Sequence, residues 1–273
     1  MASAEIAKRP TLAADALEAW GLGDGIRDKA VLVGALTLRK INNLRHPPGA
    51  SHVITIRSAG ILVSLDVYAG EHRPLREILA RDEYGVMRGN LLQPGDVVVD
   101  VGANIGVFSL ISALHVGPAG RVIAFEPHPR AFARLVRNVQ QNHFEKVIVP
   151  IQAAVSAADG ELSFDPDSIT VHNSVDAAGS TTVRAVTLDA DPNVTGLAQV
   201  DLLKIDVEGH EVAVLDGAQQ TLLRARHIVV EYQTSANREQ VTARLHGAGF
   251  ENLSETRYGD EDGLISASRP TRS

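Results

Sequence analysis

Residues 97–109 combine an acid, an asparagine and two glycines in one short stretch, Val-Val-Val-Asp-Val-Gly-Ala-Asn-Ile-Gly-Val-Phe-Ser. A run of β-branched residues before Asp100 predicts a strand that ends near this acid. Open α/β sheets bind ligands at the carboxyl ends of their strands. The glycines that follow let the backbone pass close to a ligand, and the helix expected next begins with unpaired N–H groups. We expect this loop to bind a nucleoside-containing cofactor through Asp100, Gly102, Ala103, Asn104, Gly106 and Ser109.

The glycine spacing favours a sulfonium cofactor over a dinucleotide. A dinucleotide fingerprint uses Gly-x-Gly-x-x-Gly to seat a pyrophosphate, whereas Phe108 and Ser109 stand where a third glycine would help. A pyrophosphate is also a poor neighbour for Asp100, while the ammonium group of S-adenosylmethionine suits a carboxylate. Glu126 ends the next predicted strand, near the offset at which an acid binds ribose hydroxyls, so we expect it to bind the ribose.

A second polar group follows the strands predicted at 202–206 and 227–232. Period-2 alternation places Lys204 and Asp206 on one side of the first strand. Acids gathered in a crevice are costly unless they have a function, and a positioned carboxylate or histidine could remove the proton of a hydroxyl acceptor. The catalytic candidates are Lys204, Asp206, Glu208, His210 and Glu231, and Asp206 is also expected to contact the cofactor.

Other interpretations of this group stay open. Lys204 and Glu231 are equally compatible with a buried ion pair, and residues 208–211 with a helix start, where the dipole favours acids. Asp206, Glu208 and Glu231 could hold a divalent cation, because hard cations take carboxylate oxygens. No His-x-x-x-His or similar ligand set supports a metal further, so we do not favour one.

Strands and helices alternate from residue 97 onward, which predicts an α/β fold with a doubly wound, mostly parallel sheet. Residues 156–190 break the alternation and are expected to form an insertion, with His172 and Asn173 as candidates for an acceptor wall. We place the catalytic domain at 92–273 and an N-terminal helical and β-hairpin extension at 1–91. In that extension we expect short helices within 11–45, a hairpin turning at 58–60 and a helix over 74–92.

Three polar aromatic residues of the extension have two interpretations. Tyr68, His72 and Tyr84 could contribute to a lid over the acceptor, or they could be half-buried side chains of a small subdomain.

The composition excludes several classes of site. The chain has 273 residues, a net charge of −7 and no cysteine, which rules out disulfides, thiolate metal sites and a cysteine nucleophile. No dense Lys/Arg run suggests nucleic-acid binding, and no apolar run reaches the ~18 residues of a membrane span. The N-terminus lacks the apolar core of a signal peptide. We expect a cytoplasmic protein acting on a small-molecule acceptor, and a homodimer stays open.

Six short blocks follow one another within residues 92–253. They are Val-Asp-Val-Gly-Ala-Asn-Ile-Gly (99–106), Ala-Phe-Glu-Pro (124–127), Ala-Val-Ser (154–156), Thr-Leu-Asp (187–189), Lys-Ile-Asp-Val-Glu-Gly-His-Glu (204–211) and Val-Glu-Tyr (230–232). Together they resemble the FkbM-type methyltransferase family. The resemblance implies a Rossmann-like, class I, S-adenosylmethionine-dependent methyltransferase, and family members mostly methylate oxygen on sugars, polyketides and other natural products. Gln233 is a departure, because members often carry histidine there.

With this cofactor, Pro127 and His128 would flank the adenosine, and Ala154 and Val155 would line the adenine. The alternatives are an ordinary surface histidine at 128 and plain packing at 154–155. The expected function is O-methylation of a hydroxyl. The rivals are N-methylation within the same family, a nicotinamide-dependent oxidoreductase, and a binding module that kept the fold without catalysis.

Overall fold

The computed structural model describes residues 17, 19–42, 50–87, 91–164 and 181–269 of the chain. The chain divides into two compact units, Met1–Arg81 and Asp82–Ser273. His172 and Asn173, the expected acceptor wall, lie outside the described residues. None of the described helices has the length and apolarity needed to cross a bilayer.

The first unit contains helix α2 (Ile26–Asn42) and an antiparallel hairpin of β1 (Val53–Ser58) and β2 (Ile61–Asp66). Exposed and buried residues alternate along β1, as expected for a strand with one buried face. Ala59 and Gly60 form the two-residue turn, with φ angles of 47° and 81°, and positive φ at both central residues is typical of tight hairpin turns. The predicted hairpin is confirmed.

The helix predicted over 74–92 is confirmed only in its first part. A helical turn α3 (Arg73–Leu75) continues as a π-helical turn η1 (Arg76–Ala80) and stops there. Asp82 and Gly85 then have φ angles of 52° and 70°, and the Met87 N–H donates to Asp82 Oδ1 at 2.7 Å. This side-chain hydrogen bond gives the backbone an alternative to the helix, so residues 82–87 form a loop of the second unit.

The second unit is built on a seven-stranded sheet with the order β11-β12-β10-β9-β3-β4-β5. Strands β10, β9, β3, β4 and β5 are parallel, and β12 and β11 close one edge in antiparallel pairing. The bounds are β3 (Val97–Val101), β4 (Arg121–Phe125), β5 (Ile148–Ile151), β9 (Val200–Ile205), β10 (Ala225–Tyr232), β11 (Ser254–Arg257) and β12 (Gly263–Ser268). The predicted doubly wound, mostly parallel sheet is confirmed.

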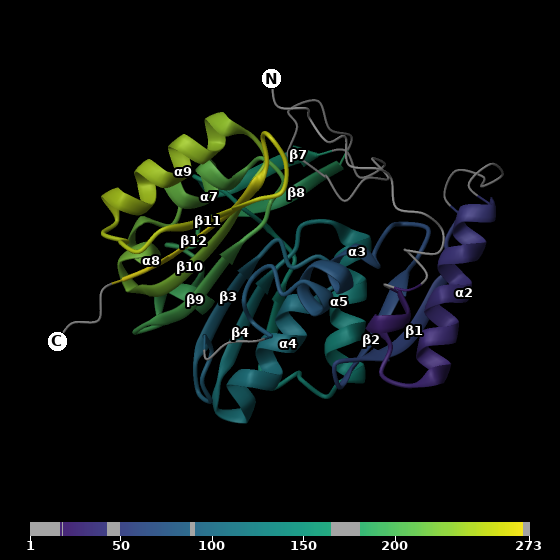
Figure 1. Cartoon of the computed structure of the whole chain (residues 1–273). Coiled ribbons are helices and arrows are strands. Elements are labelled where there is room, and N and C mark those ends of the chain that lie inside the picture. Colours follow the sequence, from purple (N-terminus) through teal and green to yellow (C-terminus); the bar gives the residue numbers. More distant parts are fainter. Residues whose placement is uncertain (1–16, 18, 43–49, 88–90, 165–180, 270–273) are drawn as a thin grey trace, which may run out of the picture. The chain divides into compact units, whose positions relative to one another are not determined.

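Helices cover both faces of this sheet (Figure 1). Helices α4 (Val107–Val116) and α5 (Pro129–Gln141) lie on one face, with the 3₁₀ turn η2 (Gly117–Ala119) after α4. On the other face lie α7 (Glu211–Asp216), α8 (Gln219–Arg224) and α9 (Ser235–Gly247). The helical segment that follows β9 is split into α7 and α8 at Gly217. A Cβ on Gly217, at the break, would lie 2.0 Å from the Ser156 carbonyl oxygen, so the chain approaches its neighbour too closely for a side chain.

A second sheet occupies the connection between β5 and β9. It has the order β6-β8-β7, with β6 (Ala154–Val155), β7 (Gly160–Phe164) and β8 (Thr181–Val186), and a short helix α6 (Pro192–Thr195) follows it. The insertion expected at residues 156–190 thus includes β7 and β8.

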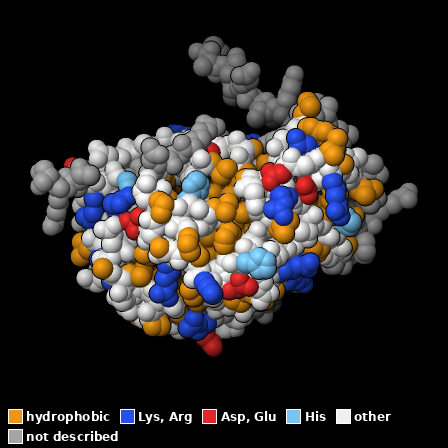
Figure 2. Space-filling view, turned by 90° about the horizontal axis from the view of Figure 1, so that it is seen from below, with side chains coloured by type: hydrophobic (Ala, Val, Ile, Leu, Met, Phe, Trp, Pro, Cys, Tyr) orange, Lys and Arg blue, Asp and Glu red, His pale blue; other side chains and the backbone are white. Residues whose placement is uncertain are grey.

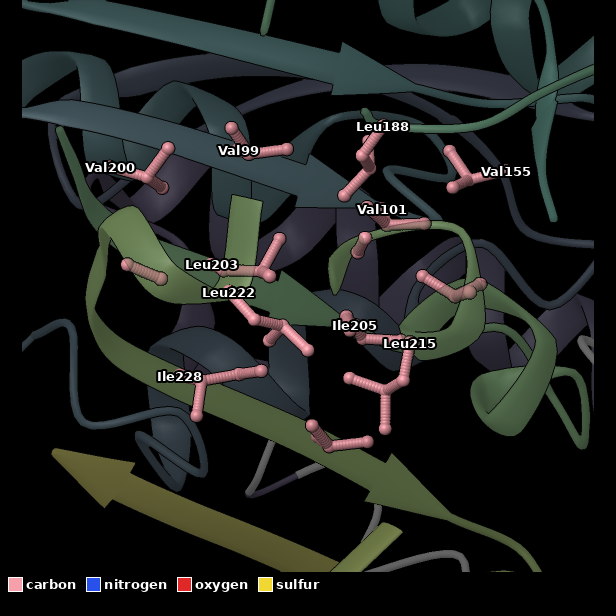
Figure 3. Close-up of a cluster of buried hydrophobic side chains, with 14 of the residues drawn as sticks. Val99, Val101, Val155, Leu188, Val200, Leu203, Ile205, Leu215, Leu222 and Ile228 are labelled. Atoms are coloured by element: carbon pink, nitrogen blue, oxygen red, sulfur yellow. The ribbon is translucent and has the colours of Figure 1, made fainter. Parts of the chain in front are cut away.

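The core of the second unit holds the carboxyl ends of the central strands in place. Every residue of β9 is buried, which is typical of a parallel strand covered on both faces. Val99 and Val101 of β3 pack with Leu203 and Ile205 of β9 and with Leu215 of α7 (Figure 3). The loops that leave these strands therefore start from fixed points.

Candidate active site

The loop after β3 approaches the loop after β9 so closely that it requires glycine. Gly102 has a φ of 79°, and a Cβ there would lie 1.8 Å from the Asp206 carbonyl oxygen. Gly106, at the start of α4, has a φ of 90°, and its Cβ would lie 2.4 Å from Leu135 Cδ1. Asn104 between them has a φ of 51°. The glycines predicted to admit a ligand are therefore required by the packing of the protein itself.

Asp100 and Ser109 are fully buried behind this loop. Ser109 Oγ donates to Asp100 Oδ2 at 2.6 Å, and Lys204 Nζ lies 3.2 Å from Asp100 Oδ1. Asp100 and Lys204 are register partners on the neighbouring strands β3 and β9, which explains why they meet. In this structure the side chains of Asp100 and Ser109 therefore contact each other and Lys204 within the protein interior.

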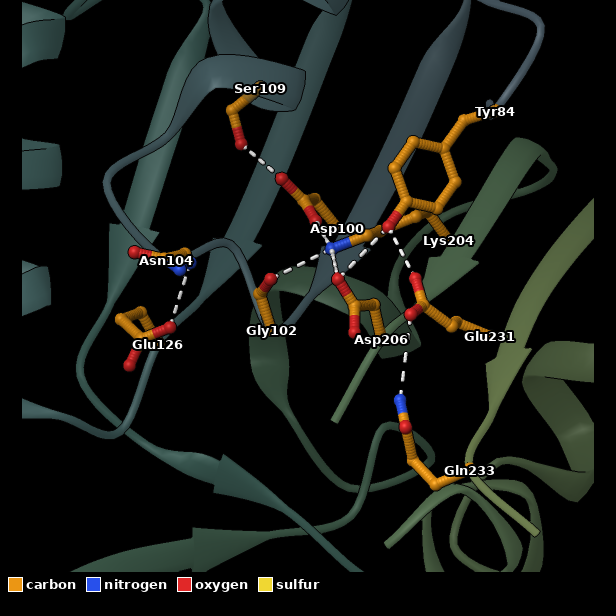
Figure 4. Close-up of polar contacts among 10 residues, drawn as sticks. All are labelled: Tyr84, Asp100, Gly102, Asn104, Ser109, Glu126, Lys204, Asp206, Glu231 and Gln233. Carbon is orange, nitrogen blue, oxygen red and sulfur yellow. Dashed lines mark hydrogen bonds and ion pairs between the residues drawn. The ribbon is translucent and has the colours of Figure 1, made fainter. Parts of the chain in front are cut away.

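Lys204 is a buried cation shared by several groups (Figure 4). Its Nζ donates to the Gly102 carbonyl oxygen at 2.7 Å and lies 3.5 Å from Asp206 Oδ2. Burial works against its charge, but the carboxylates of Asp100 and Asp206 outweigh this and raise the pKa of Lys204 above its ordinary value. The ion pairs found for Lys204 are with these two aspartates, whereas the sequence suggested a pair with Glu231.

Glu126 is held by two backbone donors. Its Oε2 accepts from the Asn104 N–H and its Oε1 from the His128 N–H, both at 2.8 Å. Burial raises the pKa of Glu126 to about 7, against the effect of these two hydrogen bonds. Because a carboxylate offers about four acceptor positions, each oxygen can accept a further hydrogen bond from a ribose hydroxyl.

The structure gives His128 a capping contact at the start of α5. Its Nδ1 accepts from the N–H groups of Arg130 and Ala131 at 3.1 and 3.3 Å. The neighbouring Pro127 is half-buried. Ala154 and Val155 are buried in β6, so packing accounts for these two small residues as well as a ligand would.

Asp206 and Glu231 meet at the hydroxyl of Tyr84, a residue that the sequence motifs did not single out as catalytic. Tyr84 Oη lies 3.0 Å from Asp206 Oδ2 and 2.9 Å from Glu231 Oε2 (Figure 4). Gln233 Nε2 is 3.5 Å from Glu231 Oε1. Strand register explains the pairing of the acids, because Ile205 pairs with Val230 and the next residues are Asp206 and Glu231.

Glu208 and His210 lie in the loop that follows β9. Glu208 has a φ of 52° and is half-buried. His210 Nε2 is 3.0 Å from Ser156 Oγ, and burial lowers the pKa of His210. The structure thus brings Lys204, Asp206 and Glu231 together and joins His210 to Ser156.

Tyr258, between β11 and β12, is a residue that sequence reasoning missed. Burial raises its pKa, with further contributions from the charges of Glu83, Glu231 and Asp206 and from a hydrogen bond to Glu83. The described part of the chain holds no group of three or more His, Asp or Glu side chains placed to bind a metal ion.

Comparisons with known proteins identify relatives of this chain. It is 30% identical to the 31-O-demethyl-FK506 methyltransferase FkbM of Streptomyces tacrolimicus, over 74% of this chain and 91% of that protein. It is also 30% identical to the hexuronic acid methyltransferase AglP of Haloferax volcanii, over 62% and 70% of the two chains. The 2-O-methyltransferase NoeI of Sinorhizobium fredii is 27% identical, over 52% and 65%.

The family described as the methyltransferase FkbM domain matches residues 100–258, which include Asp100, Glu126, Lys204, Asp206 and Glu231. The chain therefore belongs to the FkbM methyltransferase family and is a methyltransferase with a Rossmann-like fold.

Proposed function

We propose that this methyltransferase transfers a methyl group from S-adenosylmethionine to a hydroxyl of a small natural product or sugar. The observation that carries the proposal is the charge at the carboxyl edge of the sheet. Three carboxylates, Asp100, Asp206 and Glu231, gather around the cation of Lys204. This excess of negative charge suits a ligand with a sulfonium and an ammonium group, and it disfavours the pyrophosphate of a dinucleotide.

The residues present fit this cofactor. Glu126, fixed by two backbone N–H groups, would accept from the ribose hydroxyls. The loop from Gly102 to Gly106 would lie along the ligand, held in place by the close packing of Gly102 against Asp206 and of Gly106 against Leu135. Asp206 would face the charged end, and Ala154 and Val155 would line the adenine.

When bound, the cofactor supplies an electrophilic methyl group on a positively charged sulfur. The chain must then hold the acceptor in line with that methyl group and accept the proton of its hydroxyl. We propose Asp206 and Glu231 as the carboxylates that accept this proton, because both lie at the hydroxyl of Tyr84. The names of two relatives, a 31-O-demethyl-FK506 methyltransferase and a 2-O-methyltransferase, support oxygen as the acceptor atom.

The charge distribution on the surface favours a small-molecule acceptor over a nucleic acid, and we propose that the protein acts in the cytoplasm. Basic and acidic side chains are interspersed on the face shown in Figure 2, and the net charge is −7. Nucleic-acid binding usually relies on a concentrated basic surface.

We propose that the N-terminal extension contributes to acceptor binding, and a homodimer is compatible with this function.

Methyl transfer to matched acceptors tests the proposal. The chain is incubated with methyl-labelled S-adenosylmethionine and a panel of glycosides and macrolide alcohols, each paired with its amino analogue. We expect label in the hydroxyl compounds and loss of transfer in Asp206→Asn. Label confined to the amino analogues would establish N-methylation instead.

A further inference from the structure

The hydroxyl of Tyr84 has two acceptors and one hydrogen. Both Asp206 Oδ2 and Glu231 Oε2 lie within hydrogen-bond distance of it, at 3.0 and 2.9 Å. A tyrosine hydroxyl can donate only one hydrogen bond, although its oxygen can also accept. The second carboxylate is therefore satisfied at Tyr84 only if it carries a proton and donates that proton to the Tyr84 oxygen.

We propose that Tyr84, Asp206 and Glu231 form a proton-sharing group, in which the two carboxylates receive the acceptor's proton and Tyr84 is the positioning residue. The proposal rests on the proposed function and assigns the proton-accepting group within it. When the acceptor oxygen forms its bond to the methyl carbon, the carbon–sulfur bond breaks and its electron pair stays on sulfur. The hydroxyl proton passes to the carboxylates.

Several charged groups face this pair from neighbouring elements. Lys204 of β9 lies 3.5 Å from Asp206 and is itself bound to Asp100 of β3. Tyr258 lies near this pair, because burial and the charges of Glu83, Glu231 and Asp206 all raise its pKa. Glu211 of α7 also lies near Asp206, because burial and the charge of Asp206 raise the pKa of Glu211.

The surroundings of Tyr84 suit a positioning role. Its ring packs edge-on against Phe108, with centroids 5.6 Å apart, and Lys204 Nζ lies 5.5 Å from the ring centroid. These contacts fix the ring independently of its hydroxyl. The Asp206 carbonyl oxygen abuts Gly102, so the proton-sharing group adjoins the cofactor loop. Tyr84 precedes the residues matched by the family, 100–258.

Proton exchange on cofactor binding tests the proposal without a known acceptor. The full chain is titrated calorimetrically with S-adenosylmethionine and with S-adenosylhomocysteine, in buffers of different ionisation enthalpy and across pH 5.5–9. Glu126, whose pKa burial raises to about 7, meets the same ribose in both ligands. The difference between the two ligands therefore reports the groups that sense the sulfonium charge.

We expect the wild-type chain to release more protons with S-adenosylmethionine, because the cation favours the ionised carboxylate pair. Tyr84→Phe keeps the ring and removes a hydroxyl that makes two hydrogen bonds to the singly protonated pair but only one to the ionised pair. The pH of greatest excess release should then fall by about one unit. Tyr232→Phe is the matched control, because the Tyr232 hydroxyl donates to Glu255 and not to this pair, and it should leave that pH unchanged.

Two further outcomes complete the test. If Tyr84→Phe does not fold, Glu231→Gln should still abolish most of the excess proton release while retaining binding of S-adenosylhomocysteine. Equal proton release with both ligands in the wild type, or a Tyr84→Phe profile that superimposes on the wild type, would overturn the proton-sharing group while leaving the proposed function intact. A wild-type chain that binds neither ligand would instead refute the proposed function.

Discussion

The carboxylate of Glu126 is stable in its buried position only because backbone donors offset part of the cost of burial. Two N–H groups, from Asn104 and His128, hold its two oxygens. Burial nevertheless raises its pKa to about 7 from an ordinary value of 4.5. Between these two pH values the folded chain holds a proton that the unfolded chain has lost, so this group's contribution to stability declines as pH rises from about 4.5 to 7.

The same pKa predicts pH-dependent cofactor binding. Ribose hydroxyls donate best to an ionised Glu126, so affinity for S-adenosylhomocysteine should increase as pH rises through about 7. Glu126→Gln should weaken binding roughly 10- to 100-fold, as expected for lost charged hydrogen bonds, and should flatten this pH dependence. Calorimetric titration at pH 6 and pH 8 measures both effects. A wild-type affinity that is independent of pH would contradict the assigned role.

The buried pair of Asp100 and Lys204 makes a prediction about stability. Asp100→Asn leaves Lys204 buried without its nearest full charge, and removing one partner of a buried pair costs about 3–5 kcal/mol. Asp216→Asn, in the exposed pair with Arg244, should cost about 1 kcal/mol or less. Urea unfolding of both variants gives the comparison. Equal losses would show that the buried pair contributes no more than a surface pair.

At the scale of elements, the carboxyl ends of β3 and β9 can pack closely because the residue between them, Gly102, has no side chain. Gly102, after β3, combines a positive φ with contact to the Asp206 backbone after β9. Gly95, before β3, has a φ of 93°, but a Cβ added there would meet nothing within 4 Å. A substitution at Gly95 therefore causes backbone strain alone, whereas a substitution at Gly102 causes both backbone strain and a steric clash.

Alanine at each glycine should give different results. Gly95→Ala should lower the free energy of unfolding by about 1–2 kcal/mol through strain alone. Gly102→Ala should lower it further and should also reduce S-adenosylhomocysteine affinity by more than about tenfold, because the loop after β9 must move. Thermal unfolding and calorimetry distinguish them. Identical behaviour of the two variants would argue against close packing of the strand ends.

The start of α5 depends on the His128 side chain as its N-cap. His128→Ala should destabilise the chain by about 1 kcal/mol, whereas His128→Asn should recover most of that loss, because asparagine is a good N-cap. Thermal unfolding measures the capping effect. If His128 also contacts adenosine, both variants should lose cofactor affinity, even though only one loses stability.

At the scale of the whole molecule, periodicity was enough to predict the alternating strands and helices of the second unit. The acids at strand ends were also predictable, because a carboxyl strand end is recognisable from the sequence. The sequence offered Tyr84 as a candidate for a lid over the acceptor, but its contact with Asp206 and Glu231 was not predictable. Its partners lie 122 and 147 residues away along the chain, and local patterns carry no information on such contacts. The apolar spacing after residue 74 indicated a helix, although Asp82 stabilises a loop instead.

The predicted domain boundary at 91/92 and the division between units at 81/82 differ by the segment that carries Tyr84. Fragment 82–273 should be more stable than fragment 92–273, because Tyr84 packs against Phe108 within the second unit. It should also bind S-adenosylhomocysteine, since all cofactor residues named above lie in it. Equal stability of the two fragments would mean that residues 82–91 contribute nothing to the second unit.

The most direct test of the account is a competitive titration of the wild-type chain with S-adenosylmethionine and NAD⁺. We predict one molecule of S-adenosylmethionine bound per chain, weakened in Glu126→Gln, and no displacement by NAD⁺. Binding of NAD⁺ at the same loop, with S-adenosylmethionine unable to compete, would contradict the central claim that this acidic strand edge receives a sulfonium cofactor.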